Sequence, residues 1–166
     1  MDPRLQKLEQ EIASAMAGMS AEQTIAHPPG KWCAAEVLEH LYLTYTGTIK
    51  GFQRVCEAGK PLVTTATWAQ RRRMLVVVGF GHMPSGRESP KVARPRGMPA
   101  EKVRAEIGPK IIEMDSIIAR CCEELGSRRK LLDHPVLGPL TGDQWRKFHL
   151  VHGLHHVKQL WRLRQG

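Results

Sequence analysis

Apolar residues recur every three or four positions over four long stretches of the chain, which is the spacing of one face of a helix. In the first stretch, Asp2 is a favoured N-cap and Pro3 suits the first helical position. We expect this helix to end at Gly18. Its apolar stripe is Leu5, Leu8, Ile12 and Met16.

Three further stretches predict longer helices. The second runs from about Trp32 to Ala58 and stops at the Gly-Lys-Pro that follows. The third spans 99–125, and its internal Gly108-Pro109 should kink it. The last begins after Thr141, which forms a capping box with Gln144, and continues to about residue 163.

The segments between these helices are less regular. Residues 67–78 end in an apolar run that fits either a short helix or a strand, and periodicity does not decide between them. Residues 79–98 are rich in Gly, Pro and basic side chains, which is typical of a long loop. Residues 128–140 contain His134-Pro135 and Gly138-Pro139 but no strong hairpin signal, so we expect an irregular connection there.

Four long amphipathic helices and one long crossover predict an all-α fold, a four-helix bundle, in a single domain over residues 1–166. The last helix carries two apolar arcs, whereas a helix that exposes one side to solvent needs only one apolar arc. We therefore expect one arc to face the interior and the other to face a second copy in a homodimer. One arc holds Trp145, His149, His152, His156, Leu160 and Leu163, and the other holds Leu150, Leu154, Val157 and Trp161.

Composition narrows the class of protein. Apolar residues make up 42% of the 166 positions and charged residues 25%, which is ordinary for a globular domain. No run approaches the roughly 20 apolar residues of a membrane span, and the charged N-terminus lacks a signal-peptide core. We expect a cytoplasmic protein with no membrane partner. The four cysteines form no C-x-x-C pair, so we expect reduced, partly buried thiols, with a reactive thiol as the alternative.

The formal net charge of +9 raises the question of a nucleic-acid partner. The basic residues cluster at 71–73, 91–96 and 128–130. No aromatic stacking residues interleave with these clusters, and no zinc-finger or single-strand-binding motif is present. Solvated basic loops explain the charge more simply, so a nucleic-acid surface is kept as an alternative only.

Histidines carry the most specific chemical signal. His152 and His156 lie four residues apart, which places two imidazoles on one helix face, one turn apart. Such a pair forms half of a transition-metal site. His40, in the middle of the second long helix, is the candidate for a third ligand. Three histidines leave a coordination position open for water or substrate, as in catalytic sites. His149 shares the arc and is either a further ligand or a hydrogen-bonding residue, whereas His155 points away.

The surroundings of His40 suggest further roles. Glu36 and Thr44 lie one turn on either side of it, so this helix carries a polar strip. The strip is either a solvent-facing edge or the floor of a site. In the second case Glu36 or Glu39 lies close enough to orient a ligand or to act as a base, and Glu36 is our candidate catalytic residue.

Two motifs resemble those of the DinB-like (YfiT-like) superfamily. Residues 28–41, PPGKWCAAEVLEHL, resemble its second-helix motif, and residues 152–160, HGLHHVKQL, resemble its last-helix motif. Residues 134–141 also look like a subgroup of that superfamily. The resemblance implies a four-helix bundle with up-down-down-up connectivity, often dimeric. It further implies a divalent metal, commonly nickel or zinc, held by the residues that match His40, His152 and His156.

These observations lead to a functional hypothesis. Relatives of the resembled superfamily include transferases that use small thiols and proteins described as metal-dependent hydrolases. We expect a metal-dependent enzyme that acts on a small-molecule substrate and transfers a low-molecular-weight thiol, with hydrolysis as the alternative. A non-catalytic protein that binds nucleic acid through its basic surface is the third reading. Residues 60–98 match no part of the superfamily, so they leave the substrate open.

Overall fold

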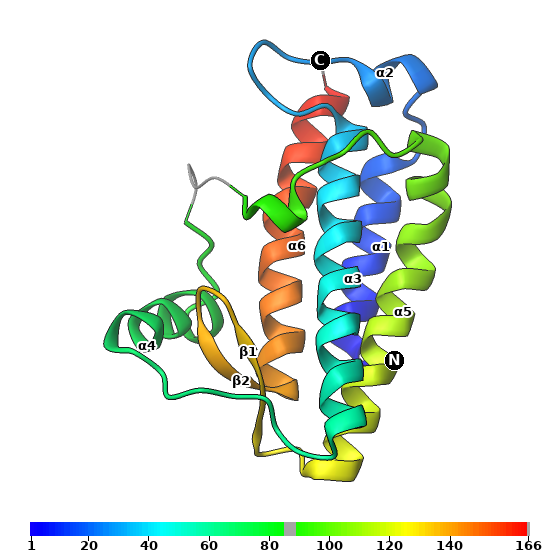
Figure 1. The fold of residues 1–166 in the computed structure, drawn as a ribbon. Coiled ribbons are helices and arrows are strands. Elements are labelled where there is room, and N and C mark those ends of the chain that lie inside the picture. The colour runs from blue at the N-terminus through cyan, green and yellow to red at the C-terminus, as the bar shows by residue number, and fades with distance from the viewer. Residues whose placement is uncertain (85–88, 166) are drawn as a thin grey trace.

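Four long helices lie side by side and set the shape of the molecule (Figure 1). The structure is a computed structural model that describes residues 1–84 and 89–165. The long helices are α1 (Pro3–Met16), α3 (Ala34–Ala58), α5 (Ala100–Leu125) and α6 (Gly142–Arg164). The short ones are α2 (Ala21–Ile25), α4 (Trp68–Met74), the π-helical turn η1 (Leu75–Gly79) and the 3-10 turn η2 (Lys91–Ala93). The described part of the chain is therefore mostly helical, as the apolar pattern predicted.

Helix starts follow the capping residues. The Asp2 carboxylate accepts the amide of Arg4 at 2.9 Å, and Thr141 forms the expected capping box with Gln144. The helix α3 begins two residues later than predicted, because Cys33 takes the N-cap position and Glu36 accepts its amide. The helix α5 continues through Pro109 as one element.

The connection before α6 corrects our prediction of an irregular segment. It is an antiparallel hairpin of β1 (Lys130–His134) and β2 (Gly138–Thr141), with Leu132 opposite Leu140. Both strands are too short to give a clear alternation in the sequence. The turn is held instead by His134, whose Nδ1 accepts the amides of residues 136 and 137, while Trp145 donates to the carbonyl of Leu132 at 3.2 Å.

The ambiguous segment after residue 67 is helical. Thr67 caps α4 with a capping box, and η1 continues the turn so that Val77 and Val78 are buried. This end of the molecule lies beside the hairpin and the first half of α6 (Figure 1). After Gly79, which ends η1, the long loop predicted over 79–98 contains only the turn η2 in its described part, and residues 85–88 of that prediction lie outside the described residues.

The core lies between the long helices, with α3 packed chiefly on α5 and α1 chiefly on α6. Cys56 and Cys121 form a disulfide between α3 and α5, with Cα atoms 5.8 Å apart. Our prediction of four reduced cysteines was therefore wrong for this pair, because packing joins residues 65 positions apart in sequence. Cys33 and Cys122 are free. No described helix is both long enough and apolar enough to cross a bilayer.

Candidate functional site

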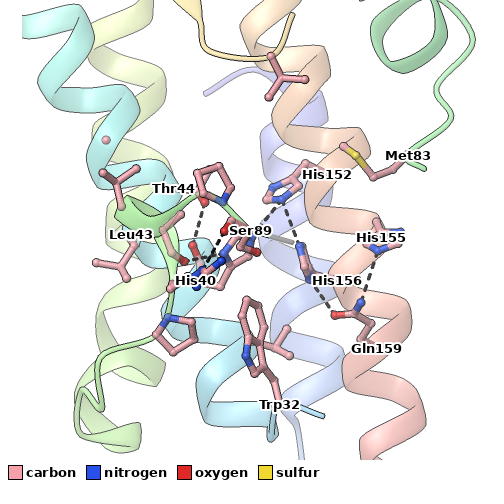
Figure 2. A pocket seen from close by; sticks show the side chains of 18 of the residues that line it. Trp32, His40, Leu43, Thr44, Met83, Ser89, His152, His155, His156 and Gln159 are labelled. Carbon is pink, nitrogen blue, oxygen red and sulfur yellow. Dashed lines mark hydrogen bonds between the residues drawn. The ribbon is translucent and has the colours of Figure 1, made fainter. Parts of the chain in front are cut away.

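Three imidazoles from two helices converge in the middle of the molecule. Nε2 of His152 lies 3.2 Å from Nε2 of His40 and 3.1 Å from Nε2 of His156. Figure 2 shows His40 reaching from α3 toward the pair on α6. The structure thus brings together all three residues that the sequence nominated as ligands, across more than a hundred residues of chain.

Two of the rings are fixed by their other nitrogen. Nδ1 of His40 lies 2.7 Å from the carbonyl oxygen of Ala93 in η2, and Nδ1 of His156 lies 2.9 Å from Oε1 of Gln159. An oxygen acceptor requires a hydrogen on Nδ1, so in each neutral ring Nε2 carries a lone pair. Both lone pairs point toward His152. Ligating histidines are oriented in this way by acceptors behind the ring.

The third ring lacks such a support. Nδ1 of His152 is buried and has no hydrogen-bond partner within the described residues. Its Nε2 carries at most one hydrogen, which cannot satisfy two facing lone pairs with good geometry. A cation between the three Nε2 atoms would take a lone pair from each of them, whereas Nδ1 of His152 would keep its hydrogen with no acceptor among the described residues. Nitrogens bound tetrahedrally at about 2.0–2.1 Å lie about 3.3–3.4 Å apart, so the observed 3.1 and 3.2 Å need little adjustment.

Burial keeps these rings neutral. It lowers the pKa of His156 to about 3, with a smaller contribution from the facing His40. Burial is also the first cause that lowers the pKa of His40, and it holds the pKa of His152 well below 6.5, where charge on His156 and His40 adds to the effect. Neutral imidazole is the form that binds a metal. The protonation state required of a ligand set is therefore present at neutral pH.

Glu39, the residue before His40, has a clear structural role. Its side chain is 2% exposed, and its oxygens accept the amides of Arg96, Gly97 and Met98 at 2.7, 3.1 and 3.1 Å. These amides follow η2, which supplies the carbonyl behind His40. Glu39 and His40, which are neighbours on α3, therefore both bind the segment of residues 93–98.

Glu36 occupies a different place from that expected of a base. It lines the cleft described below, but its Oε2 accepts the amide of Cys33 at 2.9 Å and lies 3.5 Å from Nδ1 of His27. None of its hydrogen bonds reaches the three histidines. Its carboxylate stabilises the start of α3, and a catalytic role for it stays a prediction.

The other histidines of α6 are separate from the three. His149 is fully buried, and its Nε2 lies 3.1 Å from the hydroxyl of Thr48, so it is the hydrogen-bonding residue of our two alternatives. His155 points away toward Gln159, as expected from its position on the helix (Figure 2).

A large cleft lies over the three imidazoles. Its volume is about 2190 Å³, more than the roughly 300–1,000 Å³ of common ligand pockets. One stripe of α3 forms its floor, and η2, α4, the hairpin and α6 contribute walls. Trp32, Met83 and Ser89 surround the histidines within it (Figure 2). The imidazoles are therefore within reach of a small molecule.

The sequence did not reveal the groups behind the three imidazoles. The carbonyl of Ala93 comes from a loop without periodicity, and no sequence signal marks a backbone acceptor. Gln159 could have been found, because it lies three residues after His156, on the same helix face. Glu39 was named with Glu36 as a possible support of the site, but no sequence signal pointed to its bonds with the amides of residues 96–98.

The fold and the three imidazoles define a mostly helical domain with a candidate metal-binding cleft. The family described as "Protein of unknown function (DUF1569)" matches residues 4–162, so the chain belongs to that family. No curated protein and no solved structure matches the chain.

Proposed function

We propose that this protein is a metal-dependent enzyme with a divalent ion, nickel or zinc, held by His40, His152 and His156. We further propose that it has the four-helix-bundle architecture of the DinB-like superfamily, with up-down-down-up connectivity, and that it transfers a small thiol to an electrophile. The observation that carries the proposal is the convergence of three neutral Nε2 atoms at the floor of an open cleft. The homodimer and the cytoplasmic location remain predictions.

The ligand set supports catalysis more than a structural role. Structural zinc sites are closed by four protein ligands, whereas three histidines leave one position for a substrate. Among the described residues, the group of potential ligands that contains these histidines has no fourth member. A divalent ion bound here would lower the pKa of a coordinated thiol.

The chain's own residues prepare the reaction. The acceptors behind His40 and His156 keep both rings in the ligating tautomer. The cleft orients the sulfur and the electrophile. The thiol proton goes to solvent, a sulfur–carbon bond forms, and the leaving group departs with the electron pair of the bond that breaks.

Metal titration tests the proposal. We expect one nickel or zinc ion per chain by calorimetry and elemental analysis. His152→Ala and His156→Ala should each abolish tight binding. The matched control is His155→Ala, which removes from the same helix turn an imidazole whose Nε2 faces Gln159 and not the three converging nitrogens, although its ring lies 5.2 Å from that of His156. Wild-type protein that takes up no ion, or a control variant that loses binding equally, would contradict the site.

A transfer assay tests the chemistry. The nickel-loaded protein should accelerate the reaction of mercaptoethanol with chlorodinitrobenzene, measured by absorbance, and His40→Ala should return the rate to background. An ester substrate that is hydrolysed by the loaded protein, with no thiol transfer, would favour hydrolysis instead.

A further inference from the structure

The floor of the cleft extends well beyond the histidines. One stripe of α3 lines it at spacings of three and four residues, so these positions share a single helix face. The stripe consists of Glu36, His40, Leu43, Thr44, Gly47, Thr48, Gly51 and Arg54. At 1.5 Å per residue, Arg54 lies about 21 Å along the helix from His40. The cleft is therefore a long groove with the imidazoles toward one end.

Three arginines line the part of this groove that lies toward the hairpin, away from the histidines. Arg72 and Arg73 line it from α4, and Arg54 lines it from α3. All three are exposed, and within residues 1–84 and 89–165 none of their side chains has a hydrogen bond or ion pair. We refer to these three residues as the arginine end. Guanidinium groups without protein partners are suited to bidentate binding of phosphate.

Nearby carboxylates do not neutralise the groove. Besides Arg94, the described lining holds five Lys and Arg side chains, namely Lys31, Arg54, Arg72, Arg73 and Arg162, against the carboxylates of Glu36 and Asp133. Asp133 accepts the amide and hydroxyl of Thr64 at 2.9 and 2.7 Å, and Glu36 caps α3. A groove with one sign of charge between low-dielectric walls concentrates ions of opposite charge.

We propose that the arginine end binds a phosphate group of an elongated small-molecule substrate or thiol cosubstrate, whose reactive end lies at the three histidines. This inference rests on the proposed function for the reactive end only. The phosphate contacts are made by α3 and α4, away from the imidazoles. A small uncharged thiol would leave most of the groove empty, whereas a long anionic molecule fills it.

Phosphate binding is tested first on metal-free protein, with inorganic pyrophosphate as the probe in calorimetry. The double variant Arg72→Ala/Arg73→Ala should weaken binding at least about tenfold, because it removes two charged groups that would hydrogen-bond the phosphate. The matched control is Arg128→Ala/Arg129→Ala, an adjacent pair outside the groove whose loss lowers the net charge equally. Binding to the control should equal binding to wild type.

Three outcomes would overturn the phosphate site. These are no binding of pyrophosphate, equal weakening in both double variants, and a single-stranded DNA oligonucleotide that displaces pyrophosphate at physiological salt. The last outcome would make the groove a nucleic-acid surface. Because the protein is metal-free here, a failure of the metal site leaves these results unchanged.

The length of the ligand is tested on nickel-loaded protein with two bifunctional probes, mercaptoethyl phosphate and mercaptoundecyl phosphate. The long probe should bind at least about tenfold more tightly, because only it places sulfur at the histidines and phosphate at the arginines together. Gly47 lies between the two ends, and a Cβ added there meets nothing within 4 Å. Gly47→Leu should therefore remove the advantage of the long probe while nickel and pyrophosphate still bind. Equal affinity of the two probes for wild type would overturn the spanning ligand.

Discussion

Acidification should destabilise this protein through histidines that are buried without charge, and His149 isolates one such contribution. Its side chain is fully buried, and burial lowers its pKa to about 3, from 6.5 in the unfolded chain, with a smaller effect from His134. Between these two pKa values the unfolded state binds the extra proton. The free energy of unfolding therefore falls as the pH falls below about 6.5 and levels off near 3.

The magnitude follows from the two pKa values. Each pH unit inside this window changes the stability by up to about 1.4 kcal/mol. From pH 7 to pH 5, His149 alone should lower the free energy of unfolding by about 2 kcal/mol. Other buried histidines act in the same direction, so the total loss in the wild type is larger.

The test compares wild type with His149→Met in urea unfolding at pH 7 and pH 5, without metal. The hydroxyl of Thr48 keeps its bond to the carbonyl of Thr44 in the variant, so no polar group is newly orphaned there. The loss on acidification should be about 2 kcal/mol smaller in the variant. His82→Met, a change in an exposed loop, should leave the wild-type loss unchanged. Equal pH dependence of wild type and His149→Met would refute the reasoning.

Three further predictions concern packing, the support of the site and the disulfide. Gly153→Ala should cost about 1–3 kcal/mol in urea unfolding, because its Cβ would overlap a methyl of the buried Leu8, whereas Gly47→Ala should stabilise by up to about 1 kcal/mol; similar values for both would contradict the packing. Glu39→Gln should weaken nickel binding about 10–100-fold in calorimetry, while the helical circular dichroism is retained. Unchanged affinity would show that the bonds of Glu39 to residues 96–98 do not support metal binding. Cys56→Ser should lower the unfolding free energy by about 4 kcal/mol, since it opens a loop of 65 residues, and an unchanged midpoint would show that the bridge contributes nothing.

The sequence predicted the long helices and the pairing of His152 with His156 on one helix face, because both rest on local spacing. The apolar period located α1, α3, α5 and α6 within two residues at their starts, and the i,i+4 spacing paired His152 with His156. The hairpin β1–β2 was missed since its stability comes from contacts with Trp145 and the core rather than from alternation. Glu39 was named beside Glu36 as a possible support of the site, but its bonds to residues 96–98 and the disulfide were out of reach, because each depends on which distant segments the fold brings together.

Residues 93–98 are bonded to two neighbouring residues of α3, so the opening of this segment can be measured as a sign that the three imidazoles have separated. The amides of Arg96, Gly97 and Met98 are bonded to Glu39, and the carbonyl of Ala93 is bonded to the next residue of the same helix. Opening of this segment must release His40 as well, so hydrogen exchange at these amides measures how often the site comes apart. Occupancy of the site should slow that exchange, which turns three backbone positions into a sensor that needs neither substrate nor label.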